Sequence, residues 1–225
     1  AEKSERHEWL KNEKIAVYND LIARLAEEKE VYLVDAHAAL ADENDAYPFA
    51  RYATILKEIY GRVCASGAKA VLDIGFGTGT LAGQLYQQGC DVFGQDFSSR
   101  MIQLAQEKMP RAQLYQGDFS LGLVQTLKQQ RYDAIIATYA LHHLTDEQKV
   151  AFFQELLPLL QDNGCIYVGD VAFATRAQLE QCKAQAGDDW DASEIYFVYD
   201  ELKQAFPQLR FEPMSHCAGL LTLKK

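Results

Sequence analysis

The fold of this chain is decided by the stretch AVLDIGFGTGTL, residues 70–81. Its first half is a short run of apolar, mostly branched residues, which predicts a strand buried on both faces of a parallel sheet. Glycine then holds three alternate positions, Gly75, Gly77 and Gly79, before an apolar pattern of helical period. Strand, glycine turn and helix in this order open the nucleotide site of many α/β sheets. We therefore expect the glycine backbone and the first N–H groups of the helix to face a ligand, with Asp73 adding a carboxylate at the same edge.

The glycine spacing distinguishes two kinds of cofactor site. The dinucleotide fingerprint Gly-x-Gly-x-x-Gly has its third glycine where Thr80 stands here, and the extra glycine comes one residue earlier, at Gly79. The resulting pattern, Asp-x-Gly-x-Gly-x-Gly, resembles motif I of the class I S-adenosylmethionine-dependent methyltransferases. In that family the loop wraps the methionine tail and the ribose of the cofactor. The resemblance implies that S-adenosylmethionine is bound by Asp73 and the three glycines.

Length, composition and charge fit one ordinary globular domain. The chain has 225 residues, of which 48% are hydrophobic and 24% charged. Its formal net charge of −10 counts against nucleic-acid binding, which relies on lysine and arginine. The five cysteines are scattered and form no Cys-x-x-Cys pair, which predicts reduced thiols and no zinc site. With no apolar run near the ~20 residues of a membrane span and no secretion signal, we expect a cytoplasmic protein without membrane partners.

The first third of the chain is predicted to be mostly helical. We expect residues 1–66 to form a helical extension or cap and residues 67–225 to form the cofactor-binding domain. One helix is predicted over residues 4–29, and a second opens at Tyr47-Pro48, since the first helical turn tolerates proline, and runs to Gly61. These helices are either a packing layer or a cap that closes over the ligand. The candidates for the second role are Tyr47, Phe49, Arg51 and Tyr52.

Asp96 follows the second predicted strand, residues 90–95, and lies 21 residues beyond Gly75. An acid at this distance accepts hydrogen bonds from ribose hydroxyls in nucleotide-binding sheets. The alternative is a helix cap, because Asp96 and Ser98 both precede the helix predicted over residues 101–109. By the methyltransferase resemblance, Phe97 and Met101 form one wall of the adenine pocket.

The third predicted strand, residues 112–116, is followed by Gly117-Asp118-Phe119. In the methyltransferase family an acid at this point accepts from the adenine amino group, and the next backbone N–H meets the ring. The resemblance therefore implies that Asp118 and Phe119 contact adenine. A surface turn is the alternative interpretation.

The fourth predicted strand, residues 132–138, leads into Thr138-Tyr139-Ala140-Leu141-His142-His143. Because this strand ends beside the first one at the topological switch point, Thr138 and Tyr139 are expected near the methionine end of the cofactor. Adjacent residues on a helical turn point in different directions, so we expect His142 and His143 not to share a metal. A structural role is favoured for both, and Tyr139, His142 and His143 remain candidates for a catalytic base.

The predicted helices and strands after residue 144 complete the expected strand order of the sheet. A capping box at Thr145 starts a helix that is predicted to end at Asn163-Gly164. Asp200 is predicted to cap a short helix to Phe206, and the segment from Gly187 to Tyr199 has no assignment. A strand over 165–170, a helix over 175–186 and two antiparallel strands over 209–215 and 218–223 complete the pattern. The class I methyltransferases share this succession, which implies a Rossmann-like α/β fold with a seven-stranded sheet, order 3-2-1-4-5-7-6, and strand seven antiparallel.

The resemblance spans residues 70–225 and extends to small bacterial methyltransferases of unassigned substrate. It implies in-line transfer of a methyl group from S-adenosylmethionine to a small-molecule acceptor, bound by the N-terminal helices and by residues 187–199. Such a reaction mainly requires that nucleophile, methyl carbon and sulfur be held in line, so no shared catalytic residue is implied. The alternatives are a methyltransferase acting on protein or RNA, an NAD(P)-dependent oxidoreductase, and a non-catalytic S-adenosylmethionine-binding protein. Monomer and homodimer both stay open.

Overall fold

The structure is a computed structural model that describes residues 47–48 and 50–225. The helix predicted over residues 4–29, and Phe49, lie outside the described residues. The described part falls within one compact unit, Ala41–Lys225. None of its helices is long and apolar enough to cross a membrane.

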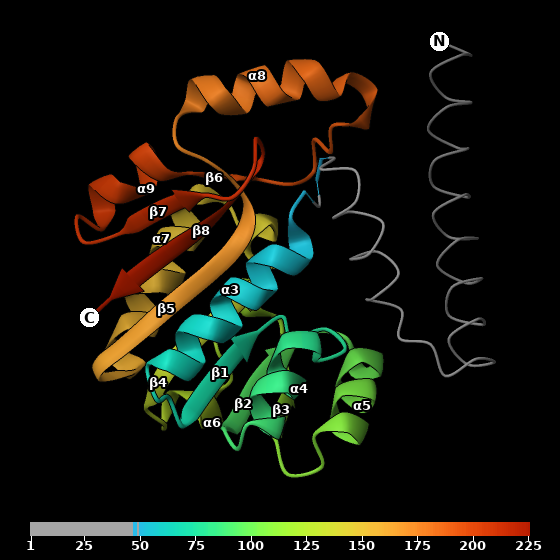
Figure 1. Cartoon of the computed structure of the whole chain (residues 1–225), viewed down its shortest axis with the longest axis vertical. Helices are drawn as coiled ribbons and strands as arrows, with labels where there is room; N and C mark the ends of the chain where they lie inside the picture. Colours follow the sequence, from blue (N-terminus) through green and yellow to red (C-terminus); the bar gives the residue numbers. More distant parts are fainter. Residues whose placement is uncertain (1–46, 49) are drawn as a thin grey trace, which may run out of the picture. The chain divides into compact units, whose positions relative to one another are not determined.

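A single mixed sheet organises this unit (Figure 1). Its main path runs β3-β2-β1-β4-β5-β8-β7. Strands β7 and β8 correspond to the predicted strands six and seven, and β8 is antiparallel to both of its neighbours, as predicted. The two-residue strand β6 was not predicted and pairs in parallel with the end of β5. The strands are β1 (Ala70–Ile74), β2 (Asp91–Asp96), β3 (Gln113–Gln116), β4 (Tyr132–Thr138), β5 (Leu160–Phe173), β6 (Phe197–Val198), β7 (Arg210–Pro213) and β8 (Ala218–Lys224).

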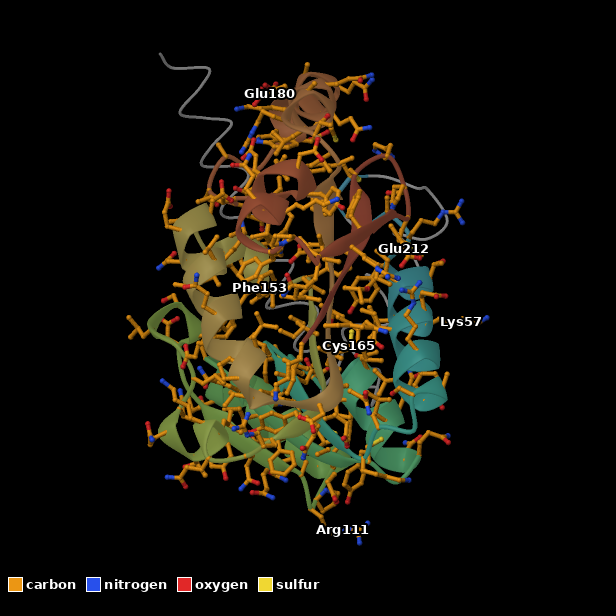
Figure 2. The ribbon with its side chains drawn as sticks, turned by 90° about the vertical axis from the view of Figure 1, so that its left-hand side faces the viewer. Lys57, Arg111, Phe153, Cys165, Glu180 and Glu212 are labelled. Atoms are coloured by element: carbon orange, nitrogen blue, oxygen red, sulfur yellow. The ribbon has the colours of Figure 1, made fainter. Side chains whose placement is uncertain are left out.

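Helices cover both faces of the sheet, and the alternation of side chains along β1 shows why. Val71 belongs to the apolar cluster under α3, α4 and α5, whereas Leu72 belongs to the cluster under α6, α7 and α9. Figure 2 shows Lys57 of α3 and Phe153 of α7 on opposite sides of the sheet. The helices are α3 (Tyr52–Ala65), α4 (Thr80–Gln87), α5 (Ser99–Lys108), α6 (Gln125–Lys128), α7 (Asp146–Leu156), α8 (Arg176–Ala186) and α9 (Tyr199–Ala205), and the short 3-10 turns are η1 (Phe119–Leu121), η2 (Leu141–His143), η3 (Leu157–Leu159) and η4 (Gly187–Asp189).

The second predicted helix is displaced along the chain. Tyr47 and Pro48 are joined by a cis peptide bond and lie in a turn, and α3 begins at Tyr52. The helix also continues past Gly61 to Ala65, because Val63 extends the buried stripe of Ile55 and Ile59. A glycine inside a helix costs about 1 kcal/mol relative to alanine, which this burial offsets.

Two helix boundaries in the C-terminal half were also wrong. The helix that starts at Thr145 ends at Leu156, because Pro158 lacks the N–H needed to continue it. The predicted stop at Asn163-Gly164 lies inside β5. Asp200 does not cap α9: Val198 is the N-cap, and Asp200 is in the first turn.

Candidate functional site

The three glycines of the loop after β1 all adopt the left-handed conformation, with φ of 66°, 54° and 74°. They differ in their surroundings. A Cβ added to Gly75 would lie 2.6 Å from the Cβ of Ala140, and one added to Gly79 would lie 2.8 Å from Cε of Met109. A Cβ on Gly77 would meet nothing within 4 Å. Gly75 and Gly79 therefore allow close packing within the protein, whereas Gly77 has open space on the side where a Cβ would lie.

Asp96 joins this loop to the end of β2. Its Oδ2 accepts a 2.9 Å hydrogen bond from the N–H of Gly77, and its Oδ1 accepts a 2.8 Å bond from the N–H of Ser98. The cap of α5 is Ser98, whose hydroxyl accepts from the N–H of Met101. Each oxygen of an ionised carboxylate has two acceptor positions, so Asp96 keeps capacity for two further donors.

Asp73 is buried beside Asp96 and carries an unsatisfied oxygen. Its side chain is 2% exposed, and Oδ1 has no hydrogen-bond partner among the described residues. Burial, and then the nearby charge of Asp96, raise the pKa of Asp73 well above its ordinary value. A buried acceptor without a donor is costly, and a ligand that brings a hydroxyl or ammonium group would satisfy it.

The predicted adenine contacts lie at the ends of two neighbouring strands. A backbone hydrogen bond joins the two strand ends: the N–H of Gly117 donates to the carbonyl of Asp96 over 3.0 Å. Phe97 is 69% exposed, an uncommon state for a phenylalanine. Asp118 caps η1 through a 2.8 Å bond from the N–H of Ser120, and hydrogen bonding from the side chain and then the backbone of Ser120 lowers the pKa of Asp118. Met101 is half-buried on α5.

Phe119 directs its side chain into the core rather than to the surface. It is 7% exposed, and its ring centroid lies 6.3 Å from that of Phe152 on α7. Any contact between this residue and a ligand is therefore made by the backbone.

The chain turns sharply where β4 ends. Thr138 is half-buried there, and Tyr139 has φ of 50°, a left-handed conformation that costs a non-glycine residue about 1–2 kcal/mol. The N–H of Tyr139 donates to the carbonyl of Gly169 on β5 over 2.8 Å. Its ring lies 5.0 Å from that of Tyr52 on α3. Backbone strain of this kind concentrates at functional sites.

The expectation that His142 and His143 point apart was wrong. The two ring centroids lie 4.3 Å apart, because the 3-10 turn η2 brings both side chains to one side. Nδ1 of His142 is 2.7 Å from Oδ1 of Asp170 on β5, and its Nε2 is 3.4 Å from Oε1 of Glu194. Burial alone would lower the pKa of His142, but the charge and hydrogen bond of Asp170 outweigh it and raise that pKa. Partial burial of the ring and the adjacent His142 lower the pKa of His143.

The segment without a predicted structure, residues 187–199, carries Glu194, the second side-chain partner of His142. Lys149, which is 1% exposed on α7, donates to the carbonyl of Ile195 over 2.6 Å, and the N–H of Ile195 donates to the carbonyl of His142 over 2.8 Å. The hydroxyl of Tyr196 donates to Oε2 of Glu194 over 2.7 Å. These bonds fix the segment against the ends of β4 and β5.

Tyr47 adds an aromatic contact from far along the chain. Its ring stacks on that of Trp190 at 5.1 Å, and its hydroxyl forms a hydrogen bond with that of Tyr196. Asp170 ends the apolar strand predicted over residues 165–170, a signal that could have marked it as a candidate site residue, although β5 continues to Phe173. No local pattern distinguished Glu194 or Trp190.

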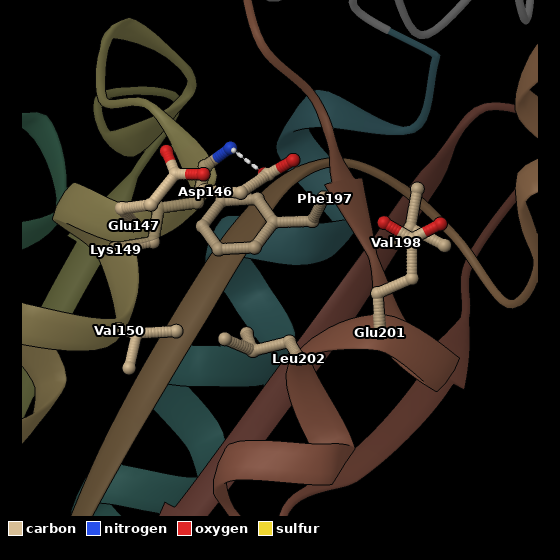
Figure 3. Close-up of a pocket in the computed structure, with 8 residues that line it drawn as sticks. All are labelled: Asp146, Glu147, Lys149, Val150, Phe197, Val198, Glu201 and Leu202. Atoms are coloured by element: carbon tan, nitrogen blue, oxygen red, sulfur yellow. Dashed lines mark hydrogen bonds and ion pairs between the residues drawn. The ribbon is translucent and has the colours of Figure 1, made fainter.

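A small pocket of about 200 Å³ lies between α7 and α9 (Figure 3). It is below the roughly 300–1,000 Å³ of ordinary small-molecule sites. Lys149 and Asp146, which form an ion pair, contribute to its wall beside Phe197. The glycine loop and Asp96 take no part in it, so this pocket is not the cofactor site.

Comparison with known proteins decides the family. A family profile described as "Methyltransferase domain" matches residues 71–164. An uncharacterized methyltransferase of Bacillus pumilus is 33% identical over 183 residues, which cover 78% of this chain and 82% of that protein. The chain belongs to the class I S-adenosylmethionine-dependent methyltransferases. As such, the methyltransferase uses S-adenosylmethionine as its methyl donor.

Solved structures agree with the fold of the methyltransferase. The magnesium protoporphyrin IX methyltransferase of Synechocystis, solved with bound SAH, has a TM-score of 0.63 and 16% identity, with 99% of this chain and 100% of that chain covered. DhpI, in a complex with SAM and HEP, has a TM-score of 0.59 and 18% identity, with 83% and 92% covered. At these identities the likeness concerns the fold alone.

Proposed function

We propose that this methyltransferase transfers a methyl group to a small-molecule acceptor held at the carboxyl ends of β4 and β5. The main support is the chemical character of the segment fixed over that edge. It carries the carboxylates of Asp189, Asp191 and Glu194 together with the rings of Trp190 and Tyr196. Aromatic walls with a few placed polar groups are typical of small-molecule sites. An acidic edge disfavours RNA, because carboxylates repel the phosphate backbone.

The residues of the glycine loop fit the methionine and ribose parts of S-adenosylmethionine. Asp73 has a buried oxygen that needs a donor, and the ammonium group of the methionine part is such a donor. There is open space on the Cβ side of Gly77, and Asp96 has two acceptor positions left for ribose hydroxyls. The cofactor supplies an activated methyl group, so the protein mainly positions and desolvates the reactants.

The adenine and acceptor sides are assigned by their strand ends. We assign the adenine ring to Phe97, Met101, Asp118 and the backbone of Phe119, which follow the neighbouring strands β2 and β3. Thr138 and Tyr139 at the end of β4 lie between the cofactor side and the acceptor side. The acceptor is then bordered by His142 and His143.

A methyl-transfer assay with separated acceptors tests this proposal. The protein is incubated with methyl-labelled S-adenosylmethionine and the small-molecule, protein or RNA fraction of a bacterial extract. We expect label in the small-molecule fraction, and an Asp96→Ala variant should lose this transfer. Label in protein or RNA would overturn the acceptor class. Cofactor binding without transfer to any fraction would indicate a non-catalytic binding protein.

A further inference from the structure

We propose that His142, His143 and Glu194 form a binding site for one divalent transition-metal ion, with zinc the best match. The ligand set is two imidazoles and one carboxylate, which suits zinc and its neighbours better than magnesium or calcium. That the ion lies beside the methyl acceptor rests on the proposed function, whereas the binding of the ion does not.

The distances between the three side chains fit a shared ion. One ligand atom from each residue lies within 4.8 Å of the others. Two ligands of a tetrahedral zinc ion are about 3.3 Å apart, since each bond is about 2.0–2.1 Å long. Nε2 of His142 and Oε1 of Glu194 are 3.4 Å apart, close to that separation and longer than an ordinary N–H···O bond. His143 is exposed, so a change of rotamer can bring its ring nitrogen closer.

Two of the three ligands are already oriented by neighbouring groups. Asp170, which is fully buried, accepts from Nδ1–H of His142 and so leaves the lone pair of Nε2 directed away from β5. Tyr196 donates to Oε2 of Glu194 and leaves Oε1 on the side of the histidine. Carboxylate–histidine pairs and hydrogen-bonded carboxylates of this kind accompany most metal ligands in proteins.

The local charge also favours a dication. The carboxylates of Asp170 and Glu194 both face His142, and Asp170 is withdrawn from water. The ammonium of Lys149, the buried cation on the adjoining helix, is held by Asp146 and by the carbonyl of Ile195. Two carboxylates balance a doubly charged ion. The competing arrangement is an imidazolium held between the two carboxylates without any metal.

A site with three protein ligands leaves a position open for an acceptor. A thiol or hydroxyl bound there would lose its proton to solvent more readily, because the metal lowers its pKa. The electron pair of that sulfur or oxygen would then form the bond to the methyl carbon, while the bond from this carbon to the sulfonium sulfur breaks and its electrons stay on that sulfur. We therefore expect the acceptor to be a small thiol or alcohol.

Cobalt titration of the metal-free chain of 225 residues tests the site. Co²⁺ reports tetrahedral N/O coordination by intense visible absorption bands, and Zn²⁺ should displace it. We expect one ion per chain, at least tenfold weaker binding in Glu194→Gln and His143→Ala, and ten- to a hundredfold weaker binding in Asp170→Asn. Both Glu194 and His143 are outside the core, so these variants should fold.

His216→Ala is the matched control, because Cys182, His216 and Cys217 also bring ligand atoms within 4.8 Å of one another. Loss of binding in that variant, with wild-type binding in Glu194→Gln, would assign the ion to the cysteine cluster and overturn the proposal. Absence of metal binding by folded protein would overturn it as well and favour the imidazolium arrangement. Titration with S-adenosylmethionine in the same samples separates the two proposals, since cofactor binding tests the methyl-donor site alone.

Discussion

The backbone N–H of Gly77 donates a 2.9 Å hydrogen bond to Oδ2 of Asp96. This bond connects the glycine loop after β1 to the end of β2, so the loop and the proposed ribose-binding acid are positioned together. Since Asp96 is 4% exposed, its side-chain oxygens are withdrawn from water and depend on such donors for their hydrogen bonds.

Replacing Asp96 by alanine should therefore weaken cofactor binding by ~1.5–3 kcal/mol, through loss of charge-assisted hydrogen bonds to ribose. Calorimetric titration with S-adenosylmethionine measures this change. Asp91→Ala, at the exposed start of the same strand, is the control and should bind as the wild type does. Unchanged affinity in folded Asp96→Ala protein would remove Asp96 from the cofactor site.

Alanine at Gly75 and alanine at Gly77 should have different effects. Both substitutions strain a left-handed residue by about 1–2 kcal/mol, but only the Cβ at position 75 meets Ala140. We expect Gly75→Ala to lose about 1–3 kcal/mol more folding stability than Gly77→Ala, from overpacking. Gly77→Ala should instead lose cofactor affinity, because its Cβ enters the space that faces the ligand.

Urea unfolding and cofactor titration of both variants give these values. The double variant Gly75→Ala/Ala140→Gly should recover part of the stability lost in the first. Equal stability loss at the two positions, with no recovery, would contradict the packing explanation.

The stability gained by Asp73→Asn should depend on pH. The folded-state pKa of Asp73 is raised, so its contribution to folding is most favourable at low pH and is lost as pH rises through that value. Asparagine resembles the protonated acid and carries no such charge. Its stabilisation relative to wild type should grow as pH rises above the ordinary pKa of an aspartate, measured as the difference in urea unfolding midpoint. A difference that shrinks with rising pH would show that Asp73 is stabilised as the anion.

Lys149→Met should loosen the segment over the ends of β4 and β5. The substitution keeps the volume of the side chain but leaves the carbonyl of Ile195 without its 2.6 Å donor. We expect a loss of about 1–3 kcal/mol in the free energy of unfolding. Hydrogen exchange should also become faster at the N–H of Ile195. Lys183→Met on the exposed face of α8 is the control and should change stability by less than about 0.5 kcal/mol.

The cofactor half of the molecule was largely predictable from sequence, since its signals are local. A buried strand, a glycine turn and a helix follow one another within residues 70–81, and the resulting sheet order is the one predicted. The capping box at Thr145 was equally visible and is present, with both of its hydrogen bonds. Such features depend on residues only a few positions apart, so they can be recognised in a short stretch of sequence.

The sequence alone thus determined the family, the order of the main sheet and the glycine loop after β1, because strand and turn patterns are short-range. Only the tertiary structure decided which residues meet at the other end of the site. Tyr47 and Tyr196 are 149 positions apart and share a hydrogen bond, while Asp170 and Glu194 approach His142 from two different segments. The predicted strand order already placed β4 beside β5, but these contacts also depend on the path of residues 187–198 across the strand ends. That path is not encoded in a local period, so no spacing in the sequence could have placed Glu194 and Tyr196 beside their partners.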